Sequence, residues 1–361
     1  GARRVQDVGL GQMNQVQQAA AWGLGRVIVQ EHPGLQAVCV DVDPNASAEE
    51  AARQLFYELD PKKGAAQQIE DQVAWRANER HVARLVVAPL DPTAHLMADR
   101  MLCANASYLI TGGMGALGMQ VAQSLVEQGA RHLVLCSRRG AVGKEAALTA
   151  LRDQGAQVLV LQADVSRHDD VIHLLQTIAS AGPPLRGVIH AAGLLDDGVL
   201  RQQSAERFAK VFQPKVAGAW HLHEQTRALD LDFFVSFSSV ASLLGSPGQG
   251  NYAAANAYLD ALAVHRRGLG LPAQAINWGP WAESGMAAEQ QIQDHLAALG
   301  VGSFTPADGI ALFQNLLSAA TEHAPQIGAV LIDWPTFYAK FPSAQLPFLS
   351  LLTQGLTAQQ E

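Results

Sequence analysis

Short apolar segments alternate with helical patterns along most of the chain, starting near residue 104. The segments that we expect to form strands are Ser107–Ile110, His132–Cys136, Gln157–Leu161, Gly187–Ala191, Phe233–Phe237 and Gln274–Asn277. Alternation of such strands with helices is typical of βαβ units. It predicts an α/β fold with a doubly wound parallel sheet, Rossmann-like in kind. A helix near Ala307–Leu317 and a strand near Ile327–Ile332 follow.

Residues 1–103 form a different, shorter pattern. We expect helices at Asn14–Gln30 and from Ser47 to about Leu59, and strands at Leu35–Val42, Gln72–Trp75 and His81–Val87. Ser47 and Glu50 have the spacing of a capping box. Gly23 and Gly25 lie within a helical pattern that no strand precedes, so they do not indicate a nucleotide site. We therefore interpret this block as structural.

Charge and cysteine content exclude several classes of function. The net charge of −8 and the lack of long basic runs argue against nucleic acid as a partner. Three cysteines without a C-x-x-C pair suggest neither a disulfide framework nor a metal site. No apolar run approaches the roughly 18 residues that span a bilayer. We expect a cytoplasmic protein that does not contact a membrane.

The strongest local motif is a glycine-rich turn. Tyr108–Thr111 reads as the end of a strand, Gly113-x-Gly115-x-x-Gly118 follows, and Met119–Gln128 continues as a helix. Glycines let the backbone approach a pyrophosphate, and the helix N-terminus directs free N–H groups at it. The alternative is a turn that only packs a helix on a strand. Its position between strand and helix favours dinucleotide binding.

The end of the next strand distinguishes the two nicotinamide dinucleotides. Ser137, Arg138 and Arg139 stand where an NAD site places an acidic residue. Guanidinium groups suit the 2′-phosphate, so the sequence favours NADPH over an ordinary exposed basic turn. Asp164 could accept a hydrogen bond from adenine. Asp164 or Ser166 could also cap the next helix, and the two roles are compatible.

Candidate catalytic residues follow later in the chain. Ser239 ends a strand, and Tyr252 and Asn256 are four residues apart on one face of a predicted helix. A tyrosine hydroxyl can protonate a carbonyl oxygen if a cation lowers its pKa, and a serine hydroxyl can polarise the same oxygen. Lys215 is the natural cation, although one tyrosine alone is more often a packing residue.

These residues resemble a known family. The chain is similar to short-chain dehydrogenase/reductases, and specifically to the ketoreductase domains of type I modular polyketide synthases. Lys215 and Asn256 have exchanged the places that the wider superfamily gives them, as in that family. His190–Gly193 and Asn277–Trp281 match further family motifs, and Ala20–Arg26 with Glu31–Pro33 match its truncated Rossmann-like structural subdomain.

The resemblance implies a division of the chain and a reaction. Residues 1–103 are the non-binding structural subdomain, N-terminally incomplete; residues 104–350 are the catalytic subdomain with a lid at about 281–305; residues 351–361 are a linker. NADPH is expected to reduce the β-keto group of a thioester carried by an acyl carrier protein, beside other domains of the same synthase module. Expected cofactor contacts are Thr111, Gly113, Met114, Gly115, Leu117, Ser137, Arg138, Arg139, Asp164, Val165, Ala191, Ala192, Gly193, Lys215, Phe237 and Ser238. Asn256 is expected to hold a proton-relay water.

The resemblance also implies a stereochemical class. Leu195-Asp196-Asp197 resembles the B-type signature, which directs formation of a D-configured β-hydroxyl, and Leu244 stands where A-type domains carry tryptophan. Gln249 is shared with some A-type domains. With Trp281 and Met286, these residues form the expected substrate-orienting set. The alternative for Asp196 and Asp197 is a solvated pair or a helix cap.

Two other functions remain open from the sequence. A catalytically silent or epimerising scaffold domain would keep the fold and consume no NADPH. A freestanding dehydrogenase of small alcohols would lack the first block and the exchange of Lys215 with Asn256.

Overall fold

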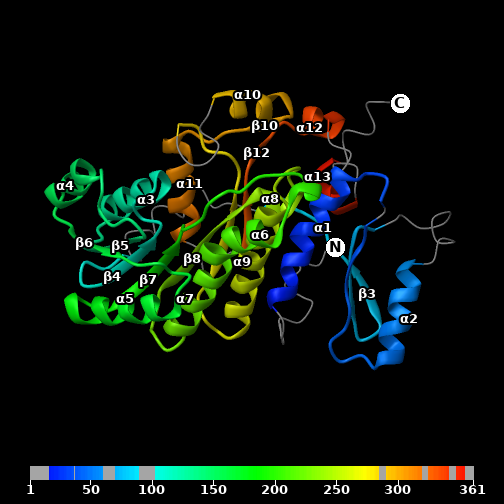
Figure 1. Ribbon diagram of the computed structural model, residues 1–361, viewed down its shortest axis with the longest axis horizontal. Coiled ribbons are helices and arrows are strands. Elements are labelled where there is room, and N and C mark those ends of the chain that lie inside the picture. Colours follow the sequence, from blue (N-terminus) through cyan, green and yellow to red (C-terminus); the bar gives the residue numbers. More distant parts are fainter. Residues whose placement is uncertain are drawn as a thin grey trace.

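A computed structural model describes residues 16–35, 37–59, 70–88, 102–283, 290–318, 324–340 and 347–353. The predicted α/β fold is confirmed (Figure 1). Seven strands form a parallel sheet in the order β11-β9-β8-β7-β4-β5-β6. In chain order they are β4 (Ser107–Thr111), β5 (His132–Ser137), β6 (Gln157–Gln162), β7 (Leu185–His190), β8 (Phe233–Ser239), β9 (Gln274–Trp278) and β11 (Gln326–Ala329).

Helices cover both faces of this sheet, as a doubly wound fold requires (Figure 1). One face carries α3 (Ala116–Glu127), α4 (Glu145–Asp153) and α11 (Pro306–Ser318). The other carries α5 (His168–Ala181), α7 (Gly218–Thr226) and α9 (Gly250–Gly268). The strand order reverses at β4, whose neighbours are β5 and β7, and the carboxyl ends of these strands border the crevice where such folds bind ligands.

The remaining elements are short and lie around this core. They are α6 (Ala205–Phe212), a π-helical turn (Gln213–Ala217), α8 (Val240–Leu244), α10 (Gln290–Ala298), β10 (Val301–Gly302), β12 (Leu331–Ile332), α12 (Trp334–Lys340), α13 (Ser350–Thr353) and 3-10 turns at Val16–Gln18, Leu200–Gln202 and Pro347–Leu349. The single strand expected at Ile327–Ile332 is wrong: β11 pairs with β9, whereas β12 pairs with β10. The chain changes sheets at Val330, which periodicity alone does not reveal.

The first block contains α1 (Ala19–Glu31), β1 (Cys39–Asp41), α2 (Ala48–Leu59), β2 (Gln72–Arg76) and β3 (Glu79–Val82). The capping box is confirmed, since the Ser47 hydroxyl accepts from the Glu50 amide and the Glu50 carboxylate accepts from the Ser47 amide. Two predicted strands differ in their bounds: β1 pairs only over Cys39–Asp41 within Leu35–Val42, and β3 begins at Glu79, before the predicted His81–Val87, and ends at Val82.

Helix α1 joins the first block to the catalytic core by packing along α9. A Cβ atom on Gly23 would lie 2.2 Å from the Ala253 carbonyl oxygen, so only glycine permits this approach. Gly23 therefore serves helix packing, whereas a Cβ on Gly25 would lie 2.7 Å from Cys39 Sγ in β1. Both glycines have packing roles, consistent with the structural interpretation of their sequence.

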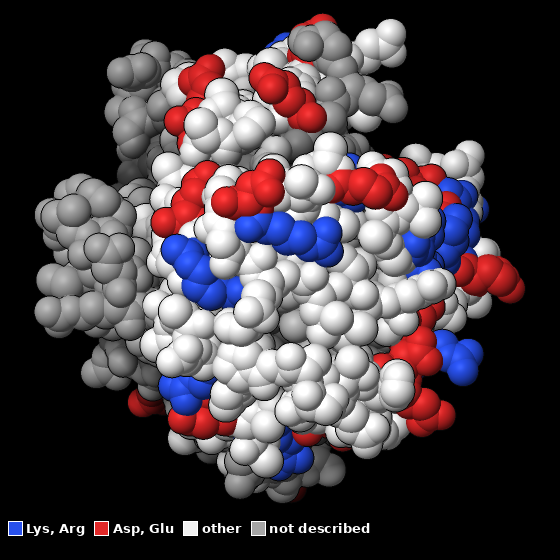
Figure 2. All heavy atoms as spheres, turned by 90° about the vertical axis from the view of Figure 1, so that its left-hand side faces the viewer, with Lys and Arg blue, Asp and Glu red and all other residues white. Residues whose placement is uncertain are grey.

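Surface charge is mixed on the face that carries α4 and α5, which Figure 2 turns to the viewer. Lysine and arginine lie beside aspartate and glutamate there, without a broad basic field. Over the described ranges, no helix is long and apolar enough to cross a bilayer.

Candidate active site

The glycine turn joins β4 to α3 at the reversal of the strand order. Gly112 has φ +68°, which favours glycine, and a Cβ on Gly118 would lie 2.4 Å from the Gly112 carbonyl oxygen. Gly115 precedes α3 as its N-cap and offers no capping side chain, which leaves the first N–H groups of the helix for an anion. The backbone here fits a pyrophosphate.

The side chains beside this turn have packing roles. Thr111 is buried, and its hydroxyl lies 2.7 Å from His190 Nδ1 at the end of β7. Met114 is buried in the main core cluster, and Leu117 packs against that cluster. At these positions the backbone is what remains to contact a cofactor.

The end of β5 presents the basic pair. Arg138 and Arg139 are exposed, and within the described ranges neither guanidinium forms an ion pair with a carboxylate. Ser137 donates its hydroxyl to the Gly140 carbonyl at 3.0 Å, which holds the turn closed. Two uncompensated cations here fit a phosphate monoester.

Asp164 organises the loop after β6. Its carboxylate accepts from the Ser166 amide at 3.0 Å and the Ser166 hydroxyl at 2.8 Å. Helix α5 begins later, at His168, with no side-chain cap, so the capping alternative for Asp164 and Ser166 is wrong. Val165 is buried where a Cβ on Gly218 would meet it at 2.8 Å.

Four elements place the predicted catalytic residues. Lys215 lies in the π-helical turn, Ser239 ends β8 and caps α8, and Tyr252 and Asn256 lie in the first half of α9. The Lys215 ammonium donates to the Phe237 carbonyl at 3.0 Å and lies 5.2 Å from the centre of the Tyr252 ring. The structure thus brings Lys215 and Tyr252 together beside the end of β8.

The environment of these groups shifts their pKa values. Burial lowers the pKa of Lys215 to about 7, against the opposing effect of Asp260. Burial raises the pKa of Tyr252 to about 12, while hydrogen bonding to Asn256 and Ser239 acts in the other direction. A buried tyrosine beside a cation can remain protonated and then donate its proton to a neighbouring oxygen that develops negative charge.

The motif His190–Gly193 at the end of β7 packs closely against Lys215. Burial, and then the Lys215 charge, lower the pKa of His190 to about 3, so this imidazole is neutral. A Cβ on Gly193 would lie 2.9 Å from Lys215 Cε, so a larger residue would displace the lysine. Ala191 and Ala192 are half-buried between them.

A buried polar network behind Ser239 was not predicted. The Asn277 amide donates to the Asp260 carboxylate at 2.9 Å and to the Ser242 hydroxyl at 2.7 Å. The same nitrogen lies 3.0 Å from the Ser238 hydroxyl and 3.2 Å from the Ser239 carbonyl, so its two hydrogens are shared among these four groups. Asp260 follows Tyr252 and Asn256 by further turns of α9, a spacing that could have indicated it.

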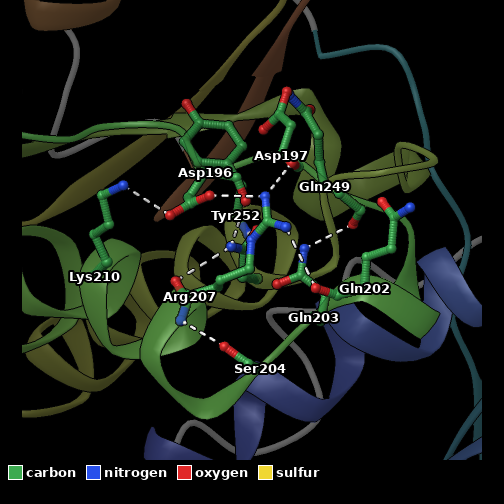
Figure 3. A network of polar contacts seen from close by, with 11 residues as sticks. Asp196, Asp197, Gln202, Gln203, Ser204, Arg207, Lys210, Gln249 and Tyr252 are labelled. Atoms are coloured by element: carbon green, nitrogen blue, oxygen red, sulfur yellow. Dashed lines mark hydrogen bonds and ion pairs between the residues drawn. The ribbon is translucent and has the colours of Figure 1, made fainter.

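The predicted substrate-orienting loop is held by cations from α6 (Figure 3). Arg207 and Lys210 each contact the Asp196 carboxylate at 2.8 Å, and Gln249 donates to Asp197 at 3.0 Å. The interpretation of Asp196 as a freely solvated charge or a helix cap is therefore wrong. Leu195 packs in the apolar cluster that contains Tyr252.

The other members of that set lie elsewhere. Leu244 ends α8 and packs toward a cluster formed by the C-terminal elements. Trp281 is 3% exposed and packs against Trp278 and Phe304, so it belongs to the core rather than to a substrate surface. Of these two partners, Phe304 comes from a later segment that the local motif does not identify. Met286 and part of the expected lid lie outside the described residues.

Comparisons with known proteins agree with this geometry. Residues 106–283 match the family described as "KR domain", and residues 2–85 match the Rossmann fold domain of the polyketide synthase extender module SpnB. Polyketide synthase GfsB of Streptomyces halstedii is 40% identical over 95% of this chain, which spans only 6% of that protein's length.

Solved structures are similar over nearly the whole chain. An A1-type ketoreductase has a TM-score of 0.85 and 35% identity, covering 99% of this chain and 73% of its own. A structure of A-type ketoreductases from a modular polyketide synthase has a TM-score of 0.82 and 36% identity, with 94% and 70% covered.

Proposed function

Since this chain belongs to the ketoreductase domains of modular polyketide synthases, which are oxidoreductases of β-keto groups, we propose that it reduces an acyl-carrier-protein-bound β-ketoacyl thioester with NADPH to a D-configured alcohol. The observation that carries this proposal is the placement of Lys215 against Tyr252 at the end of β8. Neither the silent scaffold nor the freestanding dehydrogenase has an observation in its favour.

The proposed preference for NADPH over NADH follows from the positive charge of Arg138 and Arg139. The glycine turn supplies backbone N–H groups for the pyrophosphate, and Arg138 with Arg139 would hold the 2′-phosphate. When bound, NADPH supplies the hydride for the β-carbon. The other predicted contacts, from Ala191 to Gly193 and at Phe237 and Ser238, would border the nicotinamide end.

The chain's own residues supply the proton and orient the carbonyl. The Ser239 hydroxyl accepts from the Ala241 amide at 3.2 Å, which leaves its proton to donate to the substrate oxygen. Tyr252 donates its proton to that oxygen as the carbonyl becomes an alcohol. Lys215 stabilises the tyrosinate that results, and Asn256 would hold the water that returns the proton.

The stereochemical proposal rests on Leu195, Asp196 and Asp197. Figure 3 places Asp196 and Asp197 beside Tyr252, and Leu195 packs in the apolar cluster that contains Tyr252. They would direct the acyl chain so that the D-alcohol forms. Ala254 stands where B-type domains that handle epimerised methyl groups commonly carry proline, and this resemblance favours an unbranched or unepimerised substrate. We also propose the division into residues 1–103, 104–350 with a lid at 281–305, and 351–361, with an acyl carrier protein and other module domains as partners.

The substitution Tyr252→Phe tests the proposed reductase. NADPH oxidation with a β-ketoacyl N-acetylcysteamine thioester is expected to fall by roughly 10²–10⁴-fold, the range for loss of a general acid. Retention of NADPH affinity would show that the variant is folded. Near-normal turnover would remove Tyr252 from its role, and an L-alcohol from the wild-type enzyme would overturn the D assignment.

A further inference from the structure

Glu31 connects the structural block to two loops at the candidate site. It is the last residue of α1, and its carboxylate accepts from the Leu200 amide at 2.7 Å through Oε2. Its Oε1 accepts from the Gly248 amide at 2.8 Å. One side chain thus holds two segments that are 169 and 217 residues away in the chain.

The two segments are the ones that border Tyr252. The loop after β7 contains Leu195–Asp197 and ends at Leu200, and the loop before α9 contains Gly248 and Gln249. They also touch directly, since the Gly198 amide donates to the Gly248 carbonyl at 2.7 Å. Gln249 crosses between them to Asp197 (Figure 3).

The two bonds use the two different oxygens of the carboxylate. A glutamine side chain in the same position would keep one carbonyl oxygen and turn its NH₂ donor toward the other amide. A charged acceptor also binds backbone amides more strongly than a neutral one. The observed geometry therefore favours a carboxylate at Glu31.

Neighbouring side chains of α1 support the same loop. Arg26 donates to the Ser242 carbonyl, and Gln30 donates to the Leu244 carbonyl. Gly245 and Gly248 have φ of +76° and +81°, so the loop between α8 and α9 has a fixed, glycine-dependent path. Helix α1 holds this path at its start and at its end.

A displacement of these loops would reach the proton donor. The Asn251 side chain donates to the Asp196 carbonyl at 2.9 Å, and its Oδ1 accepts from the Tyr252 amide at 2.7 Å. On the other side, Arg207 and Lys210 of α6 hold the Asp196 carboxylate. The substrate-orienting loop is thus bound by Arg207 and Lys210 at one edge and by Glu31 at the other.

We propose that Glu31 is a positioning residue that keeps the two loops in register, so that the acyl chain reaches the carbonyl site from one side only. The proposal rests on the proposed ketoreductase function. The sequence of the structural block has no nucleotide-binding motif. The proposal gives this block a part in selecting the configuration of the product.

The test compares Glu31→Gln with the wild type and with Glu49→Gln, the same change at an exposed carboxylate of α2. With an α-unsubstituted β-ketoacyl thioester and NADPH, the enantiomer ratio of Glu31→Gln is expected to fall about tenfold, equivalent to one charged hydrogen bond. KM is expected to rise several-fold with kcat changed less than about twofold, because the chemical groups are untouched. Glu49→Gln should match the wild type in all three quantities.

Amide hydrogen exchange separates this proposal from a purely structural role. Faster exchange at Leu200 and Gly248 in Glu31→Gln, together with the altered ratio, supports the proposal. Faster exchange with an unchanged ratio and KM overturns it and leaves the reductase intact. Absence of any reduction by the wild-type protein would instead overturn the proposed function.

Discussion

At the scale of single residues, burial sets the chemistry of the candidate site. Lys215 is 3% exposed and Tyr252 7%, and both pKa shifts have desolvation as their main cause. For lysine, burial disfavours the charged form, and for tyrosine it disfavours the anion. The pair therefore contains a tyrosine, the proposed proton donor, that stays protonated, and a lysine that titrates near neutral pH.

The pH dependence of kcat/KM follows from this pair. Below about pH 7 Lys215 carries its proton, and as pH rises through that value the charge that we propose stabilises the tyrosinate is lost. We expect kcat/KM for reduction to fall above about pH 7, while Tyr252 contributes no loss until about pH 12. Steady-state measurements of kcat/KM across this pH range test the prediction. The variant Lys215→Met is the control: it should be slow, and its kcat/KM should not fall above about pH 7. A constant kcat/KM between pH 6 and 9, roughly, would contradict the assignment.

Arg138 is expected to distinguish NADPH from NADH. Arg138→Ala should raise KM for NADPH about tenfold and leave KM for NADH unchanged, because only NADPH carries the phosphate that a charge-assisted bond would recognise. Cofactor titrations measure both values. Arg53→Ala on α2, whose side chain is 67% exposed, is the matched control. Equal effects on both cofactors would remove the 2′-phosphate role.

At the scale of elements, close backbone approach fixes how α1 lies on α9. The predicted helix Asn14–Gln30 is confirmed from Ala19 onward, after a 3-10 turn at Val16–Gln18, and Asn14 and Gln15 lie outside the described residues. Its periodicity does not say what it packs against. Gly23 decides the contact, because a larger residue would separate the two helices. Since α9 carries Tyr252 and Asn256, this contact belongs to the support of the site.

Gly23→Ala is expected to lower the free energy of unfolding by about 1–3 kcal/mol, the usual cost of overpacking. The backbone of Ala253, which a new Cβ would meet, cannot move without shifting α9. Urea denaturation measures the change. Gly34→Ala is the control, since a Cβ there meets nothing within 4 Å. Equal stabilities of the two variants would show that the helices do not pack as described.

At the scale of the whole molecule, the three cysteine thiols lie in different parts of the chain's fold. Cys103 is exposed, Cys39 lies in the first block near Gly25, and Cys136 is buried in the large sheet. Burial raises the pKa of Cys39 and raises that of Cys136 to about 12. A thiol reagent needs both access and the thiolate, so reactivity reports local opening.

We expect an aromatic disulfide reagent at about pH 8 to label Cys103 first and Cys136 only with global unfolding. Cys39 should react at an intermediate rate, when the first block loosens from the core. Mass spectrometry of timed samples identifies each thiol, with Cys103→Ser as the control for the fast phase. Labelling of Cys136 as fast as Cys103 would contradict the burial described here.

The sequence by itself determined the six strands from β4 to β9 that alternate with helices, the glycine turn and the candidate catalytic residues. Periodicity and short spacings such as Tyr252 to Asn256 are local, and local geometry follows from them. Tertiary structure alone decided which strand β12 joins, that Trp281 is a core residue, and that Glu31, Arg207 and Asp260 surround the site. These contacts join segments far apart in the chain, and packing between distant segments has no fixed spacing for a sequence to display.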